Sequence, residues 1–138
     1  MGIVKKSKDI PNIMENQYLT VYLNADSDIK ASAVSVGQLL AEALLNVEPR
    51  KRSRRFEEIF QATIGQFPIG AVIKDIDVMF NPAYEIDVLR VLTNAYRKRP
   101  FSLIWPGGHT NEKLFYSEAQ YEDYKDYAVA NYDILCVE

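Results

Sequence analysis

Asp75 and Asp77 are the side chains of this sequence that are best placed for chemistry. They follow a short apolar run, Ile69–Lys74, which is typical of a buried strand in a parallel sheet. Ligand sites in such sheets form at the carboxyl ends of the strands. In nucleoside triphosphatases an aspartate at this place holds the magnesium ion that bridges the phosphates, and a nearby acid often activates water. An acid after an apolar strand is a weak motif by itself, and two carboxylates that only solvate the strand end fit the pattern as well.

A phosphate-binding loop would decide between these two interpretations. Such a loop needs glycines, so that backbone N–H groups can surround the phosphates, and then a lysine and a serine or threonine. The nearest segment, Gly2–Ser7, lacks the second glycine and has no strand before it. We therefore expect no cofactor. The alternative is an ATP-binding protein whose phosphates are held by unusual N-terminal residues, namely Lys5, Lys6 and Ser7. Asp75 would then hold magnesium.

Charged and aromatic segments offer surfaces for a partner. A basic run comprises Arg50, Lys51, Arg52, Arg54 and Arg55. It is either the solvated start of a helix or a nucleic-acid-binding segment, and nucleic-acid binding would fall steeply with salt. The acidic segment 118–133 contains Tyr121, Tyr124 and Tyr127, which recur every third residue. Tyrosines are frequent in protein interfaces, although half-buried packing explains this spacing about as well.

The composition predicts one ordinary globular domain, residues 1–138. Apolar residues make up 48% of the chain and charged residues 25%, and no apolar run approaches the ~20 residues of a membrane-spanning helix. The first residues do not resemble a secretory signal, so we expect a cytoplasmic protein without membrane contact. One cysteine and one histidine exclude an internal disulfide and a Cys/His zinc site.

Apolar runs that end at turn signals predict the strands of an α/β fold. We expect a mainly parallel sheet flanked by helices, with strands over Tyr18–Leu23, Ile69–Lys74, Phe101–Trp105 and Ile134–Val137. Trp105, at the end of one of these strands, either anchors a partner or seals the edge of the sheet. Lys113–Tyr116 is expected to form a short hairpin or edge segment.

Helical spacing of apolar residues predicts the layers around this sheet. Helices are expected over Ala31–Leu45, over Arg54–Ile64 and from Val88 onward, with Ser53 and Asp87 as the N-terminal caps of the last two.

The ends of the chain give weaker signals. A short helix is expected over Tyr121–Tyr127. Residues 1–17 are expected to be irregular, with room for a short helix around Asn12–Asn16, because Pro11 interrupts any longer one.

Several segments, in this order and spacing, resemble a known family. They are Tyr22–Asn24, Arg50–Arg55, Lys74–Pro82, Ile86–Leu92, Arg97–Arg99, Ile104–Gly107, Leu114–Tyr116 and Tyr124–Tyr127. Over about residues 20–128 the chain resembles the small P-loop protein of BREX phage-exclusion systems, the BrxF type. The Trp-Pro-Gly after an apolar strand and the run Lys74–Pro82, with its aspartates followed by Phe-Asn-Pro, are the most specific parts of this resemblance.

The resemblance implies a P-loop NTPase core and a role in anti-phage defence. Asp75 would take the Walker B position, with Asp77 or Lys74 at a neighbouring site. Arg97 and Arg99 would be the arginines at the helix end before the fourth strand. Because the glycine-rich loop of the family is missing, the resemblance implies a protein that does not hydrolyse ATP and acts by binding partners.

A missing phosphate loop also has a structural consequence. In P-loop folds the strand that feeds this loop is central in the sheet, and its loss would expose strand edges and apolar surface. We therefore expect a homo-oligomer, or a complex with other defence-system proteins. The alternatives are that Ile3 and Val4 replace part of that strand, that the sheet pairs differently, or that residues 1–17 fold back over the gap.

Overall fold

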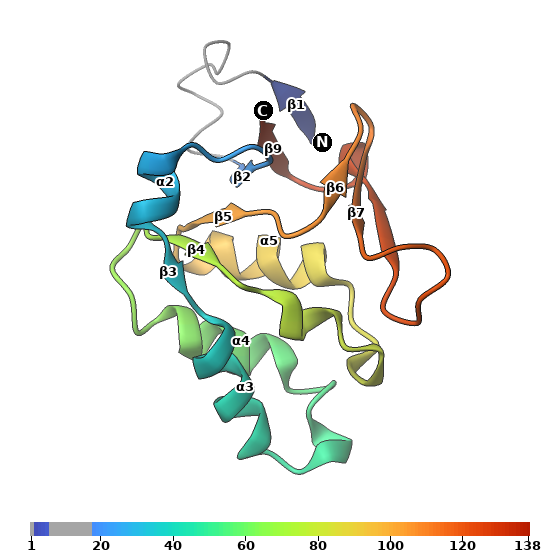
Figure 1. Ribbon diagram of the computed structural model, residues 1–138. Coiled ribbons are helices and arrows are strands. Elements are labelled where there is room, and N and C mark those ends of the chain that lie inside the picture. Colours follow the sequence, from blue (N-terminus) through green and yellow to red (C-terminus); the bar gives the residue numbers. More distant parts are fainter. Residues whose placement is uncertain (1, 6–17) are drawn as a thin grey trace.

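A computed structural model of the chain describes residues 2–5 and 18–138, and its centre is a six-stranded parallel sheet (Figure 1). The strands, in the order β1-β9-β2-β5-β4-β3, are β1 (Ile3–Lys5), β9 (Ile134–Val137), β2 (Leu19–Tyr22), β5 (Ser102–Ile104), β4 (Val72–Lys74) and β3 (Val34–Ser35). All neighbouring pairs are parallel. The expectation of one mainly parallel sheet that contains the four predicted strands is confirmed.

The centre of the sheet is continuous and contains β2, which lies within the predicted strand Tyr18–Leu23. β2 pairs with β9 on one side, where Val21 faces Cys136, and with β5 on the other, where it faces Leu103. The N-terminal residues of β1 do not replace a central strand, because Ile3 pairs with Leu135 on the outer side of β9. Among the described residues the main sheet therefore has no gap, contrary to the expectation of a sheet opened by a missing strand. The proposed short helix around 12–16 lies outside the described residues.

Three helices form one layer against the sheet. They are α3 (Gly37–Leu45), α4 (Phe56–Ile64) and α5 (Val88–Lys98); in Figure 1 α5 lies behind β4 and β5, and α3 and α4 lie below it. Their buried side chains share one hydrophobic core with Leu19, Val21 and Leu103 of the sheet. A shorter helix, α2 (Ser27–Ser32), lies on the other side and buries no residue. Because side chains alternate along a strand, Thr20 and Tyr22 point away from the three-helix layer, and they are only half-buried.

The predicted helix over Ala31–Leu45 is divided in the structure. α2 ends at Ser32, β3 pairs with β4, and α3 begins only at Gly37. The residues between the two helices include the β-branched Val34 and Val36, which favour extended backbone. Pairing of Val34 with Ile73 at the sheet edge therefore outweighed the helical spacing.

Of the two predicted helix caps, one is confirmed and the other was wrong. Asp87 caps α5 as predicted, since its Oδ1 accepts a hydrogen bond from the Arg90 N–H at 3.1 Å. Ser53 does not cap α4, because its hydroxyl donates to the Tyr84 carbonyl and α4 begins after Arg55 without a side-chain cap.

A smaller antiparallel sheet is inserted between β5 and β9. It consists of β6 (Gly108–His109), β7 (Lys113–Tyr116) and β8 (Lys125–Ala128). The predicted hairpin segment at 113–116 is confirmed as β7. The predicted helix over Tyr121–Tyr127 was wrong, because its second half is β8, in which Asp126 is exposed and Tyr127 is buried, as expected for a strand.

Four short 3₁₀ helices complete the described chain. They are η2 (Pro49–Lys51), η3 (Asp77–Phe80), η4 (Pro82–Tyr84) and η5 (Val129–Asn131). Among the described residues, no helix has both the length and the apolar character needed to cross a membrane.

Candidate functional site

The carboxyl edge of the parallel sheet is the first candidate site. Because all strands of the main sheet run in one direction, their last residues lie along the same edge, where ligands of α/β proteins bind. Asp75 follows β4, Trp105 follows β5, and the loop after β2 begins at Leu23. This edge is therefore where the resemblance to P-loop proteins would place phosphates and metal.

Asp75 occupies the predicted place, immediately after β4. Its backbone is left-handed, with φ of 63°, a conformation that aspartate tolerates better than most residues. A Cβ at Gly37, the first residue of α3, would lie 2.8 Å from the Asp75 carbonyl oxygen. The turn is thus fixed by close backbone contact, and the Asp75 side chain remains exposed.

Asp77 has a different environment. It is the first residue of η3, and its Oδ2 accepts a hydrogen bond from the Tyr116 hydroxyl at 3.0 Å. The Tyr116 ring stacks on Phe80 with centroids 3.8 Å apart. Burial, together with the hydrogen bond to Asp77, raises the pKa of Tyr116 to about 12. Asp77 therefore attaches the smaller sheet to the main one. Within the described part of the chain, no three acidic, histidine or cysteine side chains come together as a metal site.

The loop after the central strand does not have the chemistry of a phosphate loop. It runs from Leu23 to Asp26 and contains no glycine and no lysine. Asp26 caps α2 by accepting a hydrogen bond from the Ile29 N–H at 2.9 Å, and Asp28 follows in the first turn. Two carboxylates thus stand where a phosphate would need N–H donors and a cation.

The cationic candidates among the described residues lie far from Asp75. Lys5 ends β1, which is separated from β4 by three strands, or about 19 Å at the usual strand spacing. Lys6 and Ser7 lie outside the described residues. Arg97 and Arg99 lie at the end of α5, next to the amino ends of strands. Arg97 pairs with Asp133 before β9 at 3.1 Å, and Arg99 donates to the Phe67 carbonyl before β4 at 2.6 Å. The structure therefore does not bring these cations to Asp75.

The basic run between α3 and α4 is mostly paired within the chain. Arg50 and Lys51 both contact Glu48, at 3.2 and 3.7 Å. Arg52 donates to the carbonyls of Leu44 and Val47 at the end of α3. Arg55 pairs with Glu58 at 3.1 Å, and Arg54 is the one residue of the run whose side chain has no hydrogen-bond or ion-pair partner among the described residues.

Trp105 seals the junction between the sheets. Its side chain is 4% exposed, and its Nε1–H donates to the carbonyls of Gly108 and Phe115 at 3.1 and 3.0 Å. Its ring meets those of Phe80 and Tyr127 edge to face, with centroids 5.7 and 6.4 Å apart. Of the two interpretations from the sequence, the structure supports the sealed edge.

The three tyrosines do not form one surface. Tyr121 is exposed at the turn between β7 and β8, and Tyr124 donates a hydrogen bond to Asp126 at 3.0 Å. Tyr127 is buried, and its hydroxyl accepts the Val88 N–H at 3.3 Å. Burial raises the pKa of Tyr127 to about 12.

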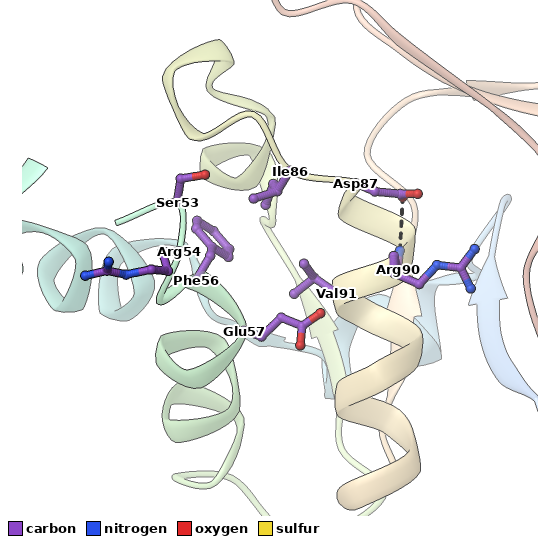
Figure 2. A pocket seen from close by; sticks show the side chains of 8 residues that line it. All are labelled: Ser53, Arg54, Phe56, Glu57, Ile86, Asp87, Arg90 and Val91. Carbon is purple, nitrogen blue, oxygen red and sulfur yellow. Dashed lines mark hydrogen bonds between the residues drawn. The ribbon is translucent and has the colours of Figure 1, made fainter. Parts of the chain in front are cut away.

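The second candidate site is a crevice between the first turns of α4 and α5, which encloses about 270 Å³ (Figure 2). It is lined by Ser53, Arg54, Phe56, Glu57, Ile86, Asp87, Arg90 and Val91. Figure 2 shows Phe56, Ile86 and Val91 between the two helices, with Glu57 reaching from α4 toward α5. Sequence reasoning missed this site, because its residues come from two segments that only the packing of α4 on α5 brings together.

No protein-family model matches this chain, and neither a curated protein nor a solved structure shows significant similarity to it. The geometry of the two candidate sites is therefore the basis for interpreting its function.

Proposed function

We propose that this chain is a P-loop-like component of a BREX-type anti-phage defence system that does not hydrolyse ATP and acts by binding other proteins. The resemblance over residues 20–128 supports the defence context. A parallel sheet with helices, in which an acidic residue follows β4 at the same edge as the loop after the central β2, is compatible with a P-loop-like ancestry.

The observation that carries this proposal is the chemistry of the loop after β2. A phosphate loop needs backbone N–H groups that are free to bind and a lysine to balance the charge. Here the N-terminus of α2 is capped by the Asp26 carboxylate, and Asp28 adds a second negative charge. Phosphates at this place would meet like charge, so binding of ATP is disfavoured.

The first alternative is an ATP-binding protein with an atypical phosphate site. It requires Lys5, Lys6 or Ser7 to act together with Asp75. The three strands between β1 and β4 argue against this for Lys5, because a lysine side chain does not reach across about 19 Å.

The second alternative is a small nucleic-acid-binding domain that uses the basic run. Intrachain partners engage Arg50, Lys51, Arg52 and Arg55, which leaves Arg54 as the cation most available to phosphate. Neutralising several phosphates is what gives nucleic-acid binding its strength, so we expect weak binding here.

Isothermal titration calorimetry of the purified chain with ATP, with and without magnesium, tests the proposal. We expect no binding tighter than a dissociation constant of about 1 mM, which corresponds to only about 4 kcal/mol of binding free energy. Asp75→Ala should leave this result unchanged. Micromolar, magnesium-dependent binding that Asp75→Ala abolishes would contradict the proposal and favour the ATP-binding alternative.

A further inference from the structure

We propose that the crevice between α4 and α5 docks a basic side chain, lysine or arginine, presented by a partner protein. This inference deepens the partner-binding role proposed above and rests on it. It concerns residues other than Asp75 and the loop after β2, so the two can be tested separately.

The size of the crevice suits one side chain. Its volume of about 270 Å³ lies below the roughly 300–1,000 Å³ of most small-molecule and cofactor sites. Its inner walls are apolar, since Phe56 and Val91 are buried in the core and Ile86 is half-buried beside them. Lysine and arginine have long apolar stems that pack on such surfaces while the charged end stays near water.

The charge that faces the crevice is negative. In Figure 2 Glu57 extends from α4 toward Val91 on α5, whereas the side chains of Arg54 and Arg90 point away from the space between the helices. Arg90 is held on its outer side, because its guanidinium lies 5.0 Å from the centre of the Tyr132 ring. A cation that enters the crevice therefore meets a carboxylate first.

The second acidic residue of the lining is already engaged. Asp87 accepts the Arg90 N–H at 3.1 Å through Oδ1 and the Tyr132 hydroxyl at 2.7 Å through Oδ2. Its carboxylate also points away from the crevice in Figure 2. This leaves Glu57 as the group that would bind the incoming charge.

Glu57 is oriented before any partner arrives. Its Oε1 accepts a hydrogen bond from Asn94 Nδ2 on α5 at 2.8 Å, while no described residue donates to Oε2. The hydrogen bond from the Ser53 hydroxyl to the Tyr84 carbonyl fixes the opposite end of the crevice. A site that is ordered in advance loses less entropy when it binds.

The helix N-termini at the crevice favour an anion rather than a cation. Two helices begin here, and the N-terminal end of a helix attracts anions. In α5 this effect is reduced, because the first N–H groups already bind the Tyr127 hydroxyl and Asp87. The experiment must therefore measure whether the crevice prefers a positively or a negatively charged ligand.

Nuclear magnetic resonance of the full chain with three small probes measures this preference. The probes are n-butylammonium, n-butanol and butyrate, which share one alkyl chain and differ in charge. We expect n-butylammonium to shift the backbone amides of Phe56, Ile86 and Val91. Its affinity should exceed that of n-butanol by up to about fivefold, as expected for one partly exposed ion pair. Butyrate should bind most weakly.

Two neighbouring variants provide the test and its control. Glu57→Gln should remove the preference for n-butylammonium over n-butanol. Glu58→Gln should retain it, because Glu58 is exposed and pairs with Arg55 instead. The inference is overturned if no probe shifts these amides, if butyrate binds best, or if Glu57→Gln keeps the preference. Any of these results would leave the calorimetric result with ATP, and with it the proposal for the carboxyl edge, unaffected.

Discussion

At the scale of single residues, Trp105 connects the two sheets through one nitrogen atom. Trp105→Phe would keep an aromatic ring but leave the carbonyls of Gly108 and Phe115 without their donor. An unpaired buried polar group costs about 1–3 kcal/mol, and these two hydrogen bonds are partly buried, so we expect the free energy of unfolding to fall by about 1–3 kcal/mol, measured by urea denaturation. Tyr121→Phe, at an exposed ring, should change it by less than about 0.5 kcal/mol. Equal effects of the two variants would contradict this role of Trp105.

Two tyrosines with raised pKa values predict how stability depends on alkaline pH. The pKa values of Tyr116 and Tyr127 are each raised to about 12 in the folded protein, first of all by burial, whereas tyrosine in an unfolded chain titrates near 10. The folded state therefore holds these protons more tightly. The resulting stabilisation is complete below pH ~10 and is lost as the pH rises toward ~12. Denaturation curves should show this decline, and Tyr127→Phe should reduce it. A decline that is identical in the variant would contradict the assignment.

At the scale of elements, α5 and α2 both have an aspartate cap, but only α5 contributes buried residues to the core. Asp87→Ala removes the cap of α5, which carries much of the core, and also the partner of the Tyr132 hydroxyl. We expect a loss of about 1–3 kcal/mol in the free energy of unfolding. Asp26→Ala removes the cap of α2, which buries no residue, and should cost less than about 0.5 kcal/mol. If both variants lose the same stability in chemical denaturation, α2 contributes more to the global fold than its exposure indicates.

The same elements show what local sequence patterns can and cannot predict. The strands β2, β4, β5 and β9 were predictable, because each is a short apolar run between turn signals. β3 was not, because its two residues owe their extended conformation to pairing with β4, a contact between distant segments. The tyrosine spacing suggested a helix, but Tyr127 is buried between Trp105 and Tyr132 in the packed aromatic cluster, which no local pattern reveals.

Of the candidate sites, too, only one part was predictable from the sequence. The position of Asp75 after a strand was predictable from the chain itself. The distances from Asp75 to Lys5 and Arg97 depend on the strand order, in which β9, β2 and β5 stand between β1 and β4. The crevice depends on the packing of α4 on α5, and Glu57 had no signal in the sequence that distinguished it from Glu58.

At the scale of the whole molecule, the expected homo-oligomer loses its main physical reason. That expectation rested on unpaired strand edges inside the sheet, and in the described sheet each inner strand is paired on both sides. The two outer strands of the sheet, β1 and β3, have three and two residues, and short edge strands discourage pairing between chains. We expect the isolated chain to sediment as a monomer of 15.8 kDa. A concentration-dependent increase toward twice this mass would show that another surface drives self-association.

The place of β9 in the sheet constrains when the protein can fold. β1 and β2 are the first two strands of the sheet in the sequence, but they do not pair with each other. β9 lies between them and pairs with both, and it is synthesised after all other strands of the sheet. While the chain is being synthesised, β1 has no neighbour to pair with, and one edge of β2 stays open. Contacts between such distant segments slow folding and prolong the exposure of unpaired strands. A nascent chain of this protein should therefore depend on chaperones until β9 has left the ribosome and closed the sheet.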